Sequence, residues 1–186
     1  MKRLLGLAFV AAIVAGTANA GERVGDFALI DHQGAIQHMA WYNDHSAVVI
    51  MPMTNSQDDA ASLKALQGTY AEQGVQFFLL NPGLHSDRAL IQSEVTALGL
   101  DLPVLMDDAQ LVTELLGVSR LDEAVLYDPS SFELLYRGPI DRMEASLKEA
   151  LAGENFEMVS VASNAPAIEF SNLDAHANLS YENDIA

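Results

Sequence analysis

Two short apolar runs on either side of an amphipathic helix constrain the fold of this chain more than any other feature. Residues 47–51 form an apolar run with β-branched residues at its centre, which is typical of a buried strand. Apolar side chains recur at helical spacing over residues 58–72, and residues 75–80 are almost wholly apolar. The pattern predicts a strand, a short loop, a helix and a second buried strand, in this order.

The rest of the chain continues this alternation and then departs from it. We expect an N-terminal strand and hairpin at residues 24–34, helices at 87–98, 107–116 and 143–151, and strands at 103–106, 124–127 and 134–137. Ser86 and either Asp107 or Asp108 are the expected N-caps. Alternation followed by a closing β-hairpin and a helix predicts an α/β fold with a mixed central sheet flanked by helices.

The first twenty residues have the pattern of an export signal. Lys2 and Arg3 precede an apolar stretch, and Ala18 and Ala20 form a small-x-small cleavage pattern before Gly21. The stretch of about 13 residues is too short to favour a membrane span, although an uncleaved anchor helix is the alternative. We therefore expect cleavage after residue 20, no stable membrane insertion afterwards, and a periplasmic or secreted protein.

Composition divides the remaining chain into a domain, residues 21–153, and a tail, residues 154–186. The tail carries acidic side chains and no Lys or Arg, and its apolar residues show no clear period. This is typical of a flexible, solvated extension or linker. The whole chain has a net charge of −17 at pH 7, and signal cleavage would make it more acidic. Such acidity argues against nucleic acid and anionic membrane surfaces as partners.

The chain contains no cysteine, so it has no disulfide and no thiol. Disulfide exchange and peroxide reduction both need a thiolate as the nucleophile. Neither reaction is available to this chain on its own, and we expect that it is not an enzyme of either kind.

Six short segments, in this order and spacing, resemble the redoxin and peroxiredoxin branch of the thioredoxin-like fold over residues 22–152. They are Val24–Phe27, Asp31–Gly34, Tyr70–Phe77, Pro103–Asp108, Leu116–Val118 and Tyr136–Asp141. The resemblance implies a reactive thiol in the loop at residues 51–57 and a cis-proline before the closing hairpin.

Both implied features are replaced in this chain. Met53 and Ser56 occupy the degenerate thiol-loop positions, and Asp122 occupies the cis-proline position. A cis bond before a non-proline residue costs about 2.5–4 kcal/mol, so we expect the peptide bond before Asp122 to be trans. The resemblance therefore implies a degenerate, cysteine-free member of the fold.

Copper binding is an alternative that the loop leaves open. Met51 and Met53 carry soft thioether donors, and His85 could approach from the loop after the next strand. The other histidines match no compact metal motif, and we expect them to be scattered on the surface. They are His32, His38, His45 and His176.

The last residues of the tail, Leu179–Ala186, resemble the lead-in to a c-type haem domain. This resemblance implies the N-terminal module of a longer, c-type cytochrome-associated protein, while an ordinary C-terminus is the alternative.

The sequence thus predicts an exported thioredoxin-like domain without redox thiols that binds a periplasmic protein partner or serves as a scaffold. The first alternative is a copper-binding or electron-transfer accessory that uses Met51, Met53 and His85. The second is an oxidoreductase module whose redox centre lies in another domain or subunit.

Overall fold

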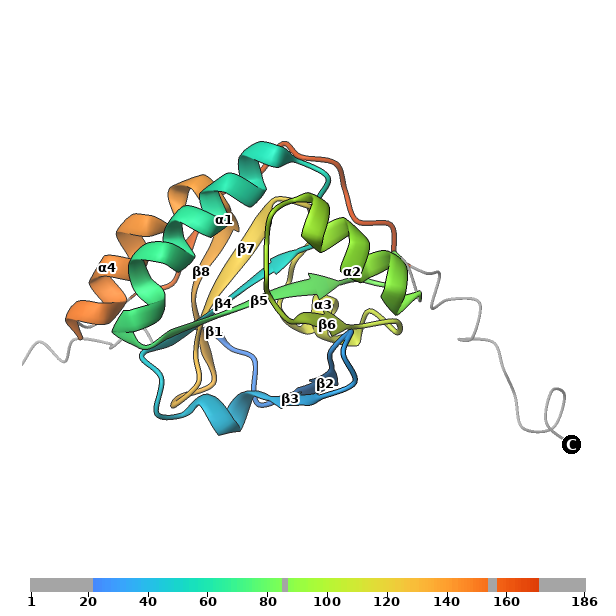
Figure 1. Cartoon of the computed structure of the whole chain (residues 1–186). Helices are drawn as coiled ribbons and strands as arrows, with labels where there is room; N and C mark the ends of the chain where they lie inside the picture. The colour runs from blue at the N-terminus through green and yellow to red at the C-terminus, as the bar shows by residue number, and fades with distance from the viewer. Residues whose placement is uncertain (1–21, 85–86, 154–156, 171–186) are drawn as a thin grey trace, which may run out of the picture.

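The computed structural model describes residues 22–84, 87–153 and 157–170, and it places their strands in one large sheet and one small hairpin (Figure 1). The large sheet has seven strands in the order β1-β8-β7-β4-β5-β6, with β9 also paired to β8. Strands β2 and β3 form the separate hairpin. The strands are β1 Glu22–Arg23, β2 Ala28–Ile30, β3 Ile36–His38, β4 Ala47–Pro52, β5 Val75–Asn81, β6 Val104–Met106, β7 Glu123–Asp128, β8 Glu133–Pro139 and β9 Val159–Ser160.

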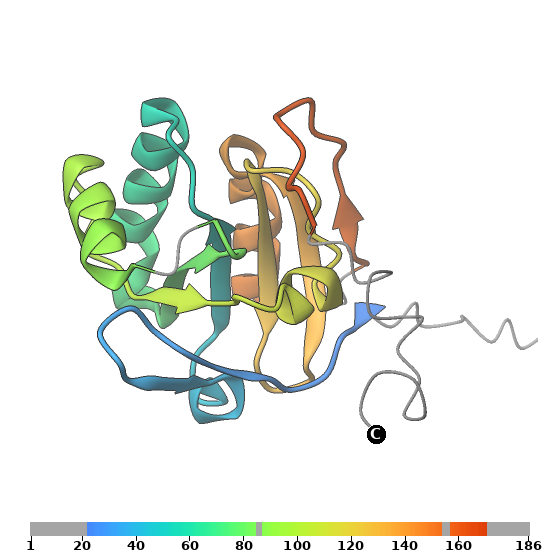
Figure 2. The same cartoon turned by 90° about the vertical axis from the view of Figure 1, so that its right-hand side faces the viewer.

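Helices cover both faces of the large sheet (Figure 2). The side chains of α1, α2 and α4 pack into one core cluster, and those of α3 pack with the region around β2 and β3 into the other. The helices are α1 Gln57–Tyr70, α2 Arg88–Ala97, α3 Leu111–Leu115 and α4 Glu144–Ala152. Single 3-10 turns lie at Met39–Tyr42, Ala71–Gln73 and Ile140–Arg142.

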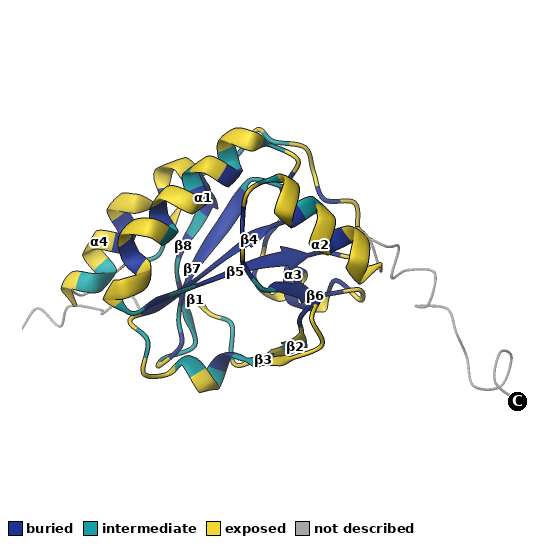
Figure 3. Cartoon of the chain, in the orientation of Figure 1, coloured by how far each residue is buried: buried dark blue, intermediate teal, exposed yellow. Residues whose placement is uncertain are grey.

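Strand β4 contributes to both core clusters because successive side chains of a strand point to opposite faces. Val49 and Met51 face the α1 side, whereas Val48 and Ile50 face the opposite side. All six residues of the strand are buried, as Figure 3 shows for the centre of the sheet. This double burial explains the continuous apolar run in the sequence.

The pairing directions confirm the predicted mixed sheet. β4 pairs with β5, and β5 with β6, in parallel, whereas β7 lies antiparallel to both β4 and β8. The predicted N-terminal hairpin is β2–β3, and the predicted closing hairpin and helix are β7, β8 and α4. The α/β class and the flanking helices are therefore as expected.

The helix starts follow from capping side chains. Ser56 accepts a hydrogen bond from the Asp59 amide at the start of α1, and Asp87 accepts from the amides of Ala89 and Leu90 at the start of α2. Ser86, the expected cap of α2, lies outside the described residues. Neither Asp107 nor Asp108 is the N-cap of α3, which begins at Leu111 after Gln110. Asp107 instead supports its first turn, since the carboxylate accepts from both the amide and the hydroxyl of Thr113 at 2.7 Å.

The expectation that the histidines are scattered on the surface is wrong for His32, which is only 6% exposed. Its Nδ1 accepts the Val104 amide at 3.1 Å, so Nε2 carries the proton and donates to the Gln92 side-chain oxygen at 2.8 Å. Periodicity cannot reveal such a histidine, because its partners are 60 and 72 residues away in the sequence. His176 lies outside the described residues.

Residues 157–170, which the sequence assigned to the solvated tail, lie against the domain, and we call them the C-terminal strap. β9 within the strap pairs in parallel with β8, and Ile168 is buried in the core cluster on the α3 side. Figure 2 shows the strap running beside β8 and across the end of the sheet. The expected export signal and Leu179–Ala186 lie outside the described residues. Among the helices that the structure describes, none is long and apolar enough to cross a membrane.

Replacing Leu63 by Ala should destabilise the domain strongly, because this α1 side chain is fully buried between the helix and the sheet. We expect a loss of about 2–5 kcal/mol in the free energy of unfolding, measured by urea denaturation. The matched control is Leu111→Ala on α3, where the side chain is 60% exposed and a change within about 0.5 kcal/mol is expected. Equal losses in the two variants would contradict this packing.

Candidate functional site

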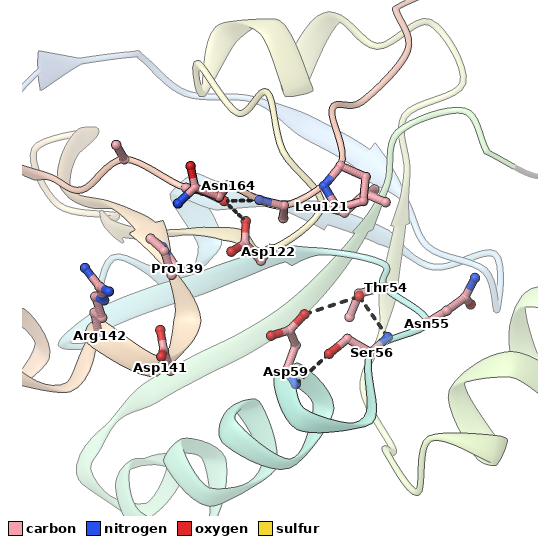
Figure 4. A pocket seen from close by; sticks show the side chains of 14 residues that line it. Thr54, Asn55, Ser56, Asp59, Leu121, Asp122, Pro139, Asp141, Arg142 and Asn164 are labelled. Atoms are coloured by element: carbon pink, nitrogen blue, oxygen red, sulfur yellow. Dashed lines mark hydrogen bonds between the residues drawn. The ribbon is translucent and has the colours of Figure 1, made fainter.

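A cleft of about 650 Å³ opens at the end of β4, where the chain leaves the sheet and enters α1. Three segments that are distant in the sequence line it: the β4–α1 loop, the loop before β7, and the strap (Figure 4). Residues after the closing hairpin complete the wall. The sequence predicted the first two segments as a degenerate site, and the structure brings them together.

The β4–α1 loop is held by its own polar side chains. The Thr54 hydroxyl accepts the Ser56 amide at 3.0 Å and donates to the Asp59 carboxylate at 3.4 Å. Ser56 Oγ in turn accepts the Asp59 amide at 3.2 Å. The predicted thiol-loop position Ser56 therefore lies at the N-terminus of α1 and lines the cleft, where its hydroxyl serves as a helix cap.

The other predicted thiol-loop position, Met53, does not line the cleft. The Met53 side chain belongs to the core cluster on the α1 side and is 6% exposed. Met51, two residues earlier on β4, is fully buried in the same cluster. Both thioethers thus pack as core side chains in this structure.

Asp122, at the predicted cis-proline position, faces the strap across the cleft. The peptide bond before it is trans, as expected, since the described chain contains no cis peptide bond. Its carboxylate accepts a hydrogen bond from the Ser163 hydroxyl, and Ser163 Oγ also accepts the Ala165 amide at 2.9 Å. An aspartate in place of proline therefore gives the loop a polar link to the strap.

Glu123, beside Asp122, does not line the cleft but holds the loop that does; the sequence alone left this pair open as a solvated loop, and for Glu123 that interpretation is wrong. Glu123 is 9% exposed, and one of its carboxylate oxygens accepts three hydrogen bonds within the loop. The donors are the Ser119 amide at 2.8 Å, the Ser119 hydroxyl at 3.1 Å and the Arg120 amide at 3.1 Å. The signal in the sequence is a carboxylate directly before a buried strand, three to four residues after the amides that it binds.

The cleft has a mixed polar and apolar lining, in which acidic side chains outnumber basic ones. Asp59, Asp122 and Asp141 line it together with Arg142. The nearby Tyr136 hydroxyl donates to the Pro139 carbonyl at 2.8 Å. Burial raises the pKa of Tyr136 to about 12 and is the largest cause of the shift. The negative charges of Asp141 and Asp122 raise this pKa further, and the positive charge of Arg142 opposes them.

The described lining of the cleft offers hydroxyl, carboxylate, amide and guanidinium groups. The described lining contains neither a thiol nor a histidine to activate the hydroxyls of Thr54 and Ser56. Elsewhere in the described chain, no three His, Cys, Asp or Glu side chains are placed to hold a metal ion. Of the copper candidates, Met51 and Met53 are buried and His85 lies outside the described residues, so copper binding stays a prediction.

Comparison with known proteins identifies the fold. The sequence matches no family model and no curated relative. Its structure is similar to that of a hypothetical protein from Sinorhizobium meliloti, with 23% identity, a TM-score of 0.69, and coverage of 82% of this chain and 94% of that one.

Two named redox proteins share the fold. A peroxidoxin from Mycobacterium tuberculosis has 19% identity and a TM-score of 0.55, with 72% of this chain and 94% of that chain covered. A putative thiol:disulfide interchange protein, DsbE, from Chlorobium tepidum has 16% identity and a TM-score of 0.58, with coverage of 70% and 96%. The protein therefore has the thioredoxin-like fold of these neighbours, and it has this fold without any cysteine.

Removing the Glu123 carboxylate should loosen the loop before β7, because the Ser119 amide, the Ser119 hydroxyl and the Arg120 amide all lose the acceptor that they share. For Glu123→Ala we expect a loss of about 1–3 kcal/mol in the free energy of unfolding and faster amide hydrogen exchange at Ser119 and Arg120. Glu123→Gln, which keeps one oxygen acceptor, should lose less. Exposed Glu149→Ala on α4 is the control, and a comparable effect there would refute the role of Glu123.

Alkaline pH should destabilise the domain in part through Tyr136. Its pKa is raised in the folded state, so the folded protein holds this proton more tightly than the unfolded chain. The resulting stability is complete below about pH 10 and is lost as the pH rises towards about 12. In Tyr136→Phe, the free energy of unfolding should fall less steeply between about pH 10 and 12. Asp141→Asn should weaken the same dependence, and an unchanged slope in Tyr136→Phe would exclude this contribution.

Proposed function

We propose that this chain is an exported domain that has lost thiol chemistry and binds a protein partner, or serves as a scaffold, in a redox-related assembly outside the cytoplasm. The observation that carries the proposal is the cleft at the end of β4. In the redoxin and peroxiredoxin branch that this chain resembles, the reactive thiol lies in the loop at this position. In this chain the loop instead presents the hydroxyls of Thr54 and Ser56.

The walls of the cleft are held in place by hydrogen bonds, and this supports recognition. Thr54, Ser56 and Asp59 fix one wall through three hydrogen bonds, and Glu123 fixes the other through three more. A binding surface with fixed polar groups loses less entropy when it engages a partner than a flexible surface does. The polar groups therefore favour a specific complex.

The setting outside the cytoplasm rests on the residue pattern at 1–20, and the redox setting rests on the DsbE-like fold. Two further proposals rest on the sequence alone. One is a copper-binding or electron-transfer accessory, for which unchanged copper affinity in a Met51→Ala, Met53→Ala variant would be contrary evidence. The other is an oxidoreductase module whose redox centre lies in another domain or subunit.

The purified protein should show no disulfide reduction and no peroxide consumption above the protein-free rate, because it supplies no thiolate. Both rates can be measured with dithiothreitol or a thioredoxin system as the electron donor. A cysteine-containing protein of the same fold is the positive control. Turnover by this chain would overturn the proposal.

A photo-crosslinking side chain should locate the partner at the cleft. Placed at exposed Asn55, beside the cleft, it should give a discrete crosslinked species in intact cells. The matched control is exposed Glu72, in the turn after the far end of α1, where no such species is expected. Crosslinks of equal yield at both positions, or at neither, would argue against recognition at this cleft.

A further inference from the structure

The C-terminal strap is bound to the domain along two separate edges. On the first, Val159 and Ser160 pair with Tyr136 and Arg137 of β8, and the Val161 amide donates to the Arg137 carbonyl at 2.8 Å. This pairing brings the strap to the rim of the cleft, where residues 162–166 form one wall.

The second edge is the loop before β7, where the strap pairs as an antiparallel strand would. The Leu121 amide donates to the Pro166 carbonyl at 3.1 Å, and the Ile168 amide donates to the Ser119 carbonyl at 2.9 Å. These bonds flank an antiparallel bridge between Arg120 and Ala167. The loop thus presents a backbone donor and a backbone acceptor to an extended segment, as a sheet edge does when it binds a peptide.

Side chains of the loop and of the strap make further contacts beside this backbone pairing. The Arg120 guanidinium donates to the Ala165 carbonyl at 3.0 Å, and Asp122 accepts the Ser163 hydroxyl. Ile168 is 5% exposed and packs in the core cluster on the α3 side. Figure 4 shows Asn164 of the strap beside Leu121 and Asp122 of the loop. An extended segment is therefore recognised by its backbone, one small polar side chain and one aliphatic anchor.

Few side chains of the strap are fully buried for its length, although Met158 and Val161 pack partly buried against the two core clusters. Ile168 is its one buried side chain, and most of the other described strap residues are exposed. Segments with few buried apolar contacts open at the low end of a protein's range of local stabilities. The strap also brings exposed Glu169, and no basic residue, to an acidic chain with a net charge of −17. A basic or neutral segment would avoid this repulsion.

We propose that residues 119–122 and the apolar site of Ile168 form a peptide-binding groove that the strap occupies in the free protein. The partner is a protein that inserts an extended, basic segment with small residues before one aliphatic side chain, and it displaces the strap. The inference rests on the proposed function and specifies its partner, because it names the structure and charge of the segment that is recognised.

The test uses the full chain and labelled synthetic peptides. The first peptide has the sequence of residues 157–170, and the second carries Lys in place of Glu169. Ile168→Asp removes the anchor and should release the strap without changing residues 119–122. Ala167→Asp is the matched control, since it adds the same charge at a neighbouring exposed position. Ser163→Ala releases the strap by a second route if Ile168→Asp does not fold.

Release of the strap should raise peptide affinity, because the strap no longer competes within the same chain. We expect binding at least about ten-fold tighter to Ile168→Asp than to the wild type or to Ala167→Asp, measured by fluorescence anisotropy. The lysine peptide should bind tighter than the first peptide, and added salt should reduce the difference. The Leu121 amide should exchange faster in Ile168→Asp and become protected again when peptide is added.

Three results would overturn the proposal. Peptide affinity that stays unchanged while the Leu121 amide exchanges faster would show that the open groove takes no peptide. Protection of that amide in both release variants would show that the strap is a fixed wall. Concentration-dependent dimers of Ile168→Asp, without peptide binding, would assign the groove to a second copy of this chain. Crosslinking at Asn55 would still test the proposed function, since that position lies on the β4–α1 loop.

Discussion

The burial of β4 on both faces is the constraint on which the rest of the structure depends. Its side chains alternate between the two core clusters, so helices must cover one face of the sheet while α3 and the β2–β3 region cover the other. Because β5 and β7 occupy the two edges of β4, the loop that follows Pro52 must emerge at the end of the sheet. The cleft lies there, and this position would be the same with or without a thiol.

The fold could be predicted because its signals are local. The apolar run of β4 and the helical spacing of α1 both lie within windows of six to fourteen residues, and both elements formed where the sequence placed them. His32 and Glu123 could not be assigned in this way, since their burial depends on how loops and strands fold back on them. The strap was missed for a related reason. Its backbone, rather than a periodic apolar face, makes most of its contacts, and Ile168 alone gives no pattern.

The sequence indicated which loops form the candidate site, but not which of their side chains line the cleft. Ser56 and Asp122 do lie on one cleft, as a resemblance to the redoxin branch implies, while the Met53 side chain packs in the core cluster on the α1 side. Side-chain direction decided this difference, because the alternation that buries Met51 on the α1 side of the sheet also places Met53 there. Sequence reasoning placed the loop correctly without resolving which of its side chains reach the cleft.

The two replaced positions are coupled through the strap, so they amount to more than a loss of chemistry. Proline at position 122 would offer no side-chain acceptor to Ser163, whereas the Asp122 carboxylate accepts that hydroxyl and links the loop to the strap. The same loop is fixed from within by Glu123, which keeps the backbone of Ser119 and Leu121 in position to pair with the strap. Adjacent carboxylates thus perform complementary tasks, one holding the groove and the other engaging its occupant. A site that needed only to dispense with a thiol would require neither carboxylate, and this supports the proposed peptide-binding groove at residues 119–122.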